Sequence, residues 1–219
     1  MSGGIEAGYE SIEAERYIIP RILTEKALLS TGIHIGTTSK TRYMMPYISK
    51  IRDDGLHILD INKTIERIHV AGRFIARHDP AKVVAYSSRE FCKTPVEKFA
   101  EVTGCVGITG RFMPGTFTNL RYPGHVDAEL LIVSDPAADQ QAVSEAARIG
   151  IPVIAVVNSD NLTADIDLAI PANNRGRKAC AAVFWLLARA TLVHSGLLAS
   201  DQPLKYSIED FETKLEELE

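Results

Sequence analysis

The sequence predicts an α/β fold: a twisted, mainly parallel central sheet with helices on both faces, layered as in flavodoxin-like or Rossmann-like folds. Two observations support this prediction. From residue 56 onward, short apolar runs rich in β-branched residues alternate with segments of helical periodicity, which is typical of βαβ units. In addition, 46% of the 219 residues are hydrophobic, enough to bury the core of one domain. Right-handed crossovers then distribute the helices over both faces of the sheet.

Six strands are expected, each a short apolar run followed by residues that favour turns. The segments between these runs predict the helices. The expected strands span residues 56–61, 82–86, 105–108, 129–133, 152–157 and 167–170.

The amino-terminal part of the chain predicts two helices. A helix over residues 20–31 has a proline in its first turn and a glycine after its end, both preferred positions. Residues 32–55 are expected to be irregular, with one helical turn around Met45. Asn62 is expected to cap a second helix that reaches about Arg77, because its side chain can accept from the first N–H groups.

Two shorter helices follow among the strands. Thr94 and Pro95 are expected to open one helix, which Gly104 closes, since proline suits a first turn and glycine suits the residue after the last turn. Residues 138–149 form the other, which again ends at a glycine.

The longest apolar stretch, residues 179–193, belongs to a helix that Asn173 or Asn174 caps and that continues to His194. Arg189 interrupts this stretch, which is also shorter than the ~20 residues that a membrane span needs. We therefore expect a helix buried within the fold and no membrane association.

The chain divides by charge into a body and two acidic ends. We expect a single α/β domain over residues 1–199, which begins with a polar acidic arm at residues 1–15, and an acidic amphipathic tail at residues 200–219. The net charge of −4 by itself argues against nucleic-acid binding. However, residues 1–15 and 201–219 hold 11 of the 28 acidic and 2 of the 24 basic residues, which leaves 22 basic and 17 acidic residues between them. A basic body with acidic ends is compatible with an RNA-binding domain.

The tail predicts a short amphipathic helix. Ser207 and Asp210 form a candidate capping box, and apolar residues follow at helical spacing. Phe211 and Leu215 are therefore candidate contacts to a protein partner, as an amphipathic helix can bind in an apolar groove. Packing of this helix on its own domain is an equally open alternative.

No motif for catalysis or metal binding is present. The sequence contains no phosphate-binding P-loop, no dinucleotide fingerprint after a strand, no nucleophile elbow and no HExxH zinc motif. The three cysteines lack metal-ligand spacing and are interpreted as reduced thiols in a cytosolic protein. We therefore expect no catalytic residue, no metal and no cofactor.

Polar side chains follow most of the expected strands. In a parallel sheet they gather at one edge, where α/β enzymes bind their substrates. This pattern keeps open a small-molecule enzyme of sugar-phosphate type, although turns and helix caps need the same residue types. The residues concerned are Asn62, Ser87, Ser88, Arg89, Thr109, Arg111, Ser134, Asp135, Asn158, Ser159, Asp160, Asn173 and Asn174.

Residues 37–52 combine basic and aromatic side chains. Basic groups pair with phosphates and aromatic rings stack on bases, so this segment is a candidate RNA contact. A solvated loop with two buried tyrosines remains an open alternative. The candidate RNA-binding residues are Lys40, Arg42, Tyr43, Lys50 and Arg52.

Two further segments are candidates for binding. In the Gly/Pro-rich loop GRFMPGTFTN at residues 110–119, Arg111 and Phe112 are expected to face RNA, and Met113 and Phe117 a protein partner. The alternative is that the large apolar residues of the loop pack under the sheet.

The second segment is NNRGRK at residues 173–178, at the start of the long helix. Arg175, Arg177 and Lys178 make it a candidate phosphate site, because the first N–H groups of a helix also attract anions.

Several of these segments together resemble the universal small-subunit ribosomal protein S2 family, in its archaeal and eukaryotic branch, whose eukaryotic member is ribosomal protein SA, the laminin receptor precursor. They occur in family order over roughly residues 20–196. The matching segments are GIHIG (32–36), DGLHILDINKT (54–64), YSSRE (86–90), GRFMPGTFTN (110–119), LLIVSDPAADQQAVSEA (130–146), IPVIAVVNSD (151–160), AIPANN (169–174) and FWLLAR (184–189).

The resemblance implies a non-enzymatic α/β domain at the head–body junction of the small ribosomal subunit, in the cytoplasm. It implies contacts with ribosomal RNA and with other small-subunit proteins, and no small-molecule substrate. Two family features are not found in this sequence. The helical-hairpin insertion of the bacterial branch is not found after the first strand. Where the eukaryotic branch has a long extension associated with laminin binding, this chain carries only a short acidic tail. We therefore expect an archaeal-type ribosomal protein without an adhesion function.

Overall fold

A five-stranded parallel sheet forms the centre of the molecule. The computed structural model describes residues 25–200 and 202–214. The strand order is β4-β3-β5-β6-β7, with all neighbours parallel. Counted along the chain within this sheet, the order is 2-1-3-4-5, which is the flavodoxin-like arrangement. The strands are β3 (Val83–Ser87), β4 (Val106–Thr109), β5 (Leu130–Val133), β6 (Val153–Val157) and β7 (Leu168–Pro171).

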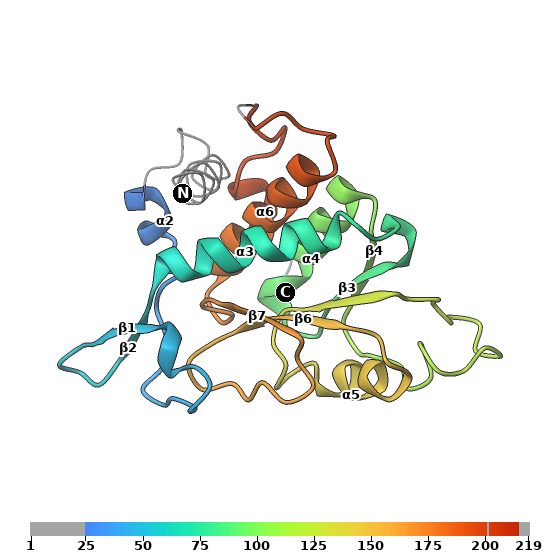
Figure 1. Ribbon diagram of the computed structural model, residues 1–219, viewed down its shortest axis with the longest axis horizontal. Coiled ribbons are helices and arrows are strands. Elements are labelled where there is room, and N and C mark those ends of the chain that lie inside the picture. Colours follow the sequence, from blue (N-terminus) through green and yellow to red (C-terminus); the bar gives the residue numbers. More distant parts are fainter. Residues whose placement is uncertain (1–24, 201, 215–219) are drawn as a thin grey trace, which may run out of the picture.

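Helices cover both faces of this sheet, as the sequence predicts (Figure 1). Among the residues that the structure describes, three long helices pack on one face of the sheet and α5 (Gln140–Ile149) packs on the other. Because side chains alternate along a strand, β3 sends Val83 and Ala85 into one core and Val84 and Tyr86 into the other. The three helices on the first face are α3 (Ile61–Ile75), α4 (Glu90–Thr103) and α6 (Arg177–His194).

The first expected strand, residues 56–61, is not part of the parallel sheet. Its centre forms β2 (His57–Leu59), which pairs antiparallel with β1 (Ile48–Ile51), a strand in the segment expected to be irregular. The two strands form a separate hairpin. The helical turn around Met45 is confirmed as a 3₁₀ turn over Met45–Tyr47, and the described part of the first helix is α2 (Glu25–Ser30).

Three helix starts differ from the prediction. Asp60, not Asn62, caps α3: its carboxylate accepts from the backbone N–H of Asn62. Helix α4 begins at Glu90, so Pro95 lies inside the helix. Helix α6 begins after Gly176, with no side-chain cap.

The side chain of Asn173 nevertheless organises the turn before α6. Its Oδ1 atom accepts from the N–H groups of Arg175 and Gly176. The glycine stops at Gly104 and Gly150 are confirmed, and both residues have left-handed backbone angles.

Helices α3 and α6 approach each other closely. A Cβ atom on Gly72 of α3 would lie 2.6 Å from the Cβ atom of Ala190 in α6, nearer than two carbon atoms can pack. Glycine therefore sets the distance between these helices. Helix α6 is buried on nearly all sides from Ala179 to Thr191, which explains its apolar sequence. Among the described residues, no helix is long and apolar enough to cross a membrane.

The carboxy-terminal residues 202–214 form a strap across α4 and α6. Phe211 is fully buried in the core of its own domain, so it is not an exposed partner contact. Trp185 donates from its indole nitrogen to the carbonyl oxygen of Tyr206 at 2.8 Å. Ser207 and Asp210 form the expected capping hydrogen bonds, but the described chain continues only as a 3₁₀ turn, Glu209–Phe211.

Leu215 and the arm at residues 1–15 lie outside the described residues.

Candidate nucleic-acid interface

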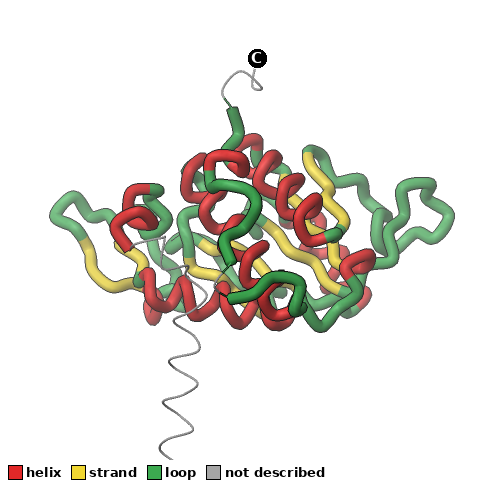
Figure 2. Tube along the Cα trace, turned by 90° about the horizontal axis from the view of Figure 1, so that it is seen from above, coloured by secondary structure: helices red, strands yellow, loops and turns green. Residues whose placement is uncertain are grey.

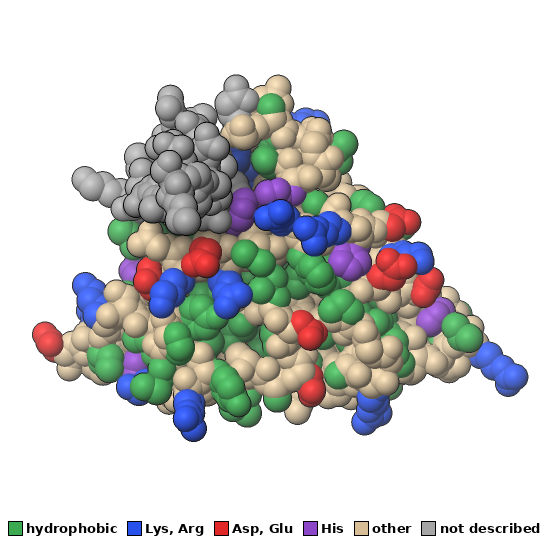
Figure 3. All heavy atoms as spheres, viewed as in Figure 1, with side chains coloured by type: hydrophobic (Ala, Val, Ile, Leu, Met, Phe, Trp, Pro, Cys, Tyr) green, Lys and Arg blue, Asp and Glu red, His purple; other side chains and the backbone are tan. Residues whose placement is uncertain are grey.

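Exposed basic side chains occur along the segment that leads into and begins the β1–β2 hairpin, at one end of the molecule (Figure 1). Figure 3 shows Lys and Arg side chains spread over this end among apolar ones. We call this segment's exposed side chains the basic hairpin surface. All five residues predicted for RNA contact in this segment are exposed. The ring of Tyr43 is 70% exposed, which argues against the alternative of two buried tyrosines. The basic hairpin surface consists of Lys40, Arg42, Tyr43, Lys50 and Arg52.

Tyr47, the second tyrosine, has a structural role. It is half-buried, and Arg67 donates a hydrogen bond to its hydroxyl at 2.8 Å. Between the two tyrosines, Met44 is fully buried and anchors the segment in the core. The backbone turn around Met44 therefore directs Tyr43 outward and Tyr47 against α3.

The segment is also fixed to the carboxyl edge of the main sheet. Ser159, just after β6, accepts from the N–H of Thr37 and donates to the carbonyl oxygen of Ser39, both at 2.9 Å. Gly36 permits this approach, because a Cβ atom there would lie 3.1 Å from the hydroxyl of Ser159 and 2.6 Å from the carbonyl oxygen of His57. The basic side chains thus extend from a backbone held at several points.

The loop at residues 110–124 extends from the other end of the molecule (Figures 1 and 2). Arg111 is exposed, as predicted. Phe112 and Phe117 are only 6% and 5% exposed: their rings pack together, and Phe112 packs on Tyr86. The predictions that Phe112 faces RNA and that Phe117 faces a partner are therefore corrected, and the alternative that they pack beneath the sheet holds.

A buried carboxylate explains how the loop folds inward. Glu145 of α5 accepts hydrogen bonds from the N–H groups of Gly115, Phe117 and Thr118 at 2.9–3.0 Å, and from the Thr118 hydroxyl. Burial raises the pKa of Glu145, but these hydrogen bonds outweigh it and leave the pKa below its usual value. Glu145 thus acts as a clamp on the loop.

Two apolar side chains still project from the loop. Met113 is 48% exposed, as predicted, and Leu120 is 84% exposed. Sequence reasoning missed Leu120, although a large aliphatic residue in a Gly/Pro-rich loop was a usable signal.

The cations at the start of α6 are mostly paired within the chain. Arg175 forms an ion pair with Asp160 at 2.5 Å, and Arg177 forms one with Glu212 of the strap at 2.7 Å. Lys178 is exposed. The five residues of the basic hairpin surface thus come from one continuous exposed segment, Arg111 belongs to the loop at residues 110–124, and ion pairs neutralise part of the third candidate segment.

Polar side chains gather at the carboxyl edge of the sheet, but they bind one another. Asp139 accepts from the N–H and hydroxyl of Ser88 and from the hydroxyl of Ser134, and the Ser134 hydroxyl also contacts that of Ser87. Burial raises the pKa of Asp139 despite these hydrogen bonds. Next to this group, Arg89 binds the fully buried Asp135.

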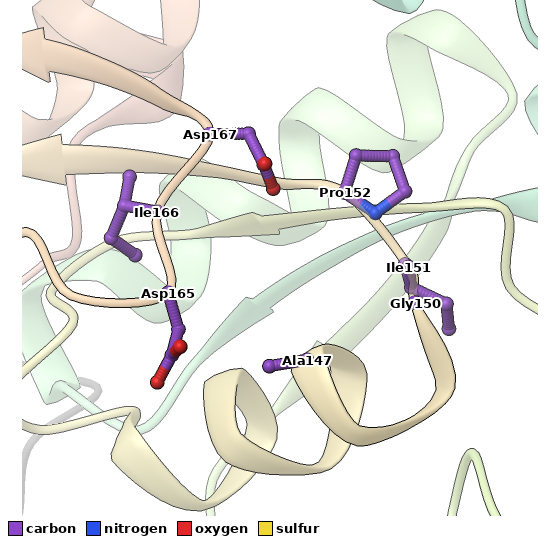
Figure 4. A pocket seen from close by; sticks show the side chains of 7 residues that line it. All are labelled: Ala147, Gly150, Ile151, Pro152, Asp165, Ile166 and Asp167. Carbon is purple, nitrogen blue, oxygen red and sulfur yellow. The ribbon is translucent and has the colours of Figure 1, made fainter.

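This network occupies the switch point between β3 and β5, where a flavodoxin-like fold binds its ligand. The enzyme hypothesis required convergent polar groups around an open pocket at this edge. At this edge the polar groups bind one another. A hollow of about 440 Å³ lies at the opposite, amino ends of β6 and β7 (Figure 4), lined by Ala147, Gly150, Ile151, Pro152, Asp165, Ile166 and Asp167. The described residues contain no group of three or more potential metal-binding side chains.

Comparison with known proteins identifies the family of this chain. A family model described as ribosomal protein S2 matches residues 28–122 and 125–193. The relative in Nitrosopumilus maritimus, named small ribosomal subunit protein uS2, is 46% identical over 195 residues, which cover 89% of this chain and 94% of the relative.

Two relatives of the same name show similar agreement. That of Thermoplasma volcanium is 46% identical over 194 residues, covering 89% of this chain and 98% of the relative. That of Staphylothermus marinus is 45% identical over 197 residues, covering 90% of each chain. The chain belongs to the ribosomal protein S2 family.

Proposed function

We propose that this chain is an archaeal-type structural protein of the small ribosomal subunit, which binds ribosomal RNA and neighbouring proteins at the head–body junction and works in the cytoplasm without catalysing a reaction. The names of its relatives support the ribosomal role. The single observation that supports the RNA contact is the basic hairpin surface, which presents four cations and an aromatic ring from a fixed backbone.

The chemistry of this surface suits a phosphate backbone. Residues 37–52 contain four cations and no acidic residue, and the acids of this hairpin, Asp53 and Asp54, are confined to its turn. Arg52 forms an ion pair with Asp54 at 3.4 Å, but both side chains are more than half exposed, and such surface pairs exchange readily for a phosphate. The exposed Tyr43 ring could stack on an unpaired base, as RNA-binding proteins commonly do.

A matched pair of variants tests this assignment. The first changes Lys40, Arg42 and Lys50 to Gln. The control changes Arg73, Arg77 and Arg148 to Gln: these are also exposed, cause the same loss of charge, and lie on or just after helices, away from the hairpin. Binding to small-subunit ribosomal RNA is measured across a range of salt concentrations, and incorporation into small subunits is measured by gradient sedimentation.

We expect the hairpin variant to bind RNA more weakly and to lower the slope of log affinity against log salt by about 2–3, since each lost phosphate contact removes nearly one unit. The control should keep the slope and incorporate normally. Equal losses in both variants would indicate nonspecific charge effects and refute the hairpin as the RNA contact.

The exposed apolar side chains of the far loop support a protein contact there. Met113 and Leu120 project from a loop that Glu145 holds in one conformation, so a partner can bind a preformed surface at low entropic cost. Changing both residues to Ser should weaken the association with neighbouring small-subunit proteins and leave the affinity for naked RNA unchanged. Loss of RNA affinity in this variant would contradict a protein-facing loop.

A further inference from the structure

Two buried cysteines on neighbouring helices place their sulfur atoms side by side. Cys92 lies in the first turn of α4 and Cys180 in the first turn of α6, and their Sγ atoms are 2.7 Å apart. Both residues are at most 2% exposed. They are 88 positions apart in the sequence, so only the packing of α4 on α6 brings them together.

We propose that Cys92 and Cys180 are a redox site that forms a disulfide when the folded protein meets a small peroxide. To reach a disulfide bond length of about 2.05 Å, the two sulfurs need to approach by less than 1 Å. The third thiol, Cys105, cannot compete for either partner in the folded chain. It follows the last turn of α4 and lines a hollow with Thr191 near the end of α6. A helical rise of about 1.5 Å per residue therefore places it more than about 15 Å from both Cys92 and Cys180.

The chemistry balances with hydrogen peroxide as the oxidant. One thiol, as its thiolate, attacks a peroxide oxygen, which forms a sulfenic acid and releases one water. The sulfur of the second cysteine then displaces the hydroxyl group as a second water, and the S–S bond forms. Two electrons pass from the two sulfurs to the peroxide, and the two thiol protons leave in the waters.

The surroundings make this a slow reaction that depends on the oxidant. Hydrogen bonding to Cys92, followed by burial, raises the pKa of the Cys180 thiol well above its usual value. The thiolate is the reactive form, and a raised pKa keeps its fraction small at neutral pH. Oxidation by peroxide is therefore slow at neutral pH, and its rate rises with pH. The bond would join the first turns of α4 and α6, next to the segment at residues 173–178.

The test uses the full chain and its Cys105→Ser variant, which retains only the two paired thiols. Each folded protein is treated with hydrogen peroxide at pH 8, quenched in acid, denatured, and alkylated. We expect a mass lower by two hydrogen atoms, a linked peptide pair containing residues 92 and 180, and no alkylation of either cysteine. Oxidation should raise the melting temperature by about 5–10 °C, since a disulfide closing a long loop stabilises a domain, and a reductant should reverse the change.

A denatured sample supplies the control, because unfolded chains should link Cys92 to the nearer Cys105 as well. The proposal is overturned if both cysteines of the folded protein remain open to alkylation, which would make them a packed thiol pair only. It is also overturned if the folded chain links Cys105 instead, or if peroxide converts Cys92 or Cys180 to a sulfinic acid without a linked peptide. None of these measurements involves RNA, so they are independent of the ribosomal proposal.

Discussion

The hydroxyl of Thr213 in the strap donates a hydrogen bond to the carbonyl oxygen of Phe91 in α4 at 3.2 Å. In an unbroken helix this carbonyl would accept from the residue four positions later. That residue is Pro95, which has no N–H group. The hydroxyl of Thr213 therefore replaces the hydrogen-bond donor that α4 lacks, although the two residues are 122 positions apart in the sequence.

This relationship predicts a coupling between the strap and the proline. Thr213→Val keeps the shape of the side chain but leaves the carbonyl of Phe91 unsatisfied, so the free energy of unfolding should fall by about 1–2 kcal/mol. In a Pro95→Ala background the helix regains its own donor, and the same substitution should cost much less. Urea unfolding of the four proteins measures the coupling; equal costs in both backgrounds would show that Thr213 stabilises by packing alone.

The ion pair between Arg89 and Asp135 predicts a second double-mutant cycle. Asp135 is fully buried, and the Arg89 side chain is 34% exposed. Arg89→Met should lower the free energy of unfolding by about 2–3 kcal/mol, less than for a fully buried pair because solvent screens the arginine. Adding Asp135→Asn removes the uncompensated charge and should recover part of the loss. A double variant less stable than Arg89→Met would argue that Asp135 matters through its bond to Asn161 instead.

The clamp at Glu145 predicts an acid-sensitive loop. Its pKa is below the ordinary value of 4.5 in the folded protein. The stabilisation is therefore complete above that value and is lost as the pH falls through the folded pKa. Hydrogen exchange at the N–H groups of Gly115, Phe117 and Thr118 should accelerate relative to the core as the pH falls below 4.5 and through the lowered pKa of Glu145. Glu145→Gln should speed exchange at neutral pH and flatten the pH dependence; an unchanged profile would exclude the clamp.

The contact between α3 and α6 predicts that Gly72→Ala destabilises the fold. Alanine favours helices by up to about 1 kcal/mol over glycine, but here its Cβ atom would collide with Ala190. We expect a net loss of about 1–3 kcal/mol, measured by urea unfolding. Ala190→Gly in the same chain should restore only part of it, because the backbone of Ala190 is also within 3 Å. A Gly72→Ala variant that is more stable than the parent would mean that the helices can separate at little cost.

The parallel strands and most of their helices were predictable from the sequence, because local apolar runs and turn residues determine them. Strands β3 to β7 are mostly apolar runs between two layers of helices and loops, and their limits differ from prediction by at most one residue. The hairpin was not predictable in this way. A strand with one buried face alternates in burial, yet Ser49, Lys50 and Ile51 of β1 are all exposed. Pairing with β2, not the local pattern, makes this segment a strand.

The incorrect predictions of the α4 start and of the loop residues arise from contacts between residues far apart in the sequence. Pro95 suggested a helix start because proline usually occupies a first turn, and nothing near it in sequence reveals that Thr213 compensates for it. Phe112 and Phe117 suggested an exposed surface because they lie in a Gly/Pro-rich loop, yet Glu145 folds that loop inward from α5. The basic hairpin residues stay predicted RNA contacts. Their exposure follows from local causes, since charged side chains remain in water almost regardless of the path of the backbone.

The hairpin and the far loop lie at opposite ends of the long axis of the molecule (Figures 1 and 2). Ligands at the two ends cannot obstruct each other, and a rigid sheet lies between them. Under the proposed function, with RNA bound at the hairpin and a protein at the far loop, the chain would be bivalent: once one end is bound within a particle, the other end meets its target at a high effective concentration, set by geometry and not by the amount of free protein. Two individually weak contacts then suffice for a long residence time. Both contacts form together only where the two binding partners are separated by the fixed distance between the two ends of this chain.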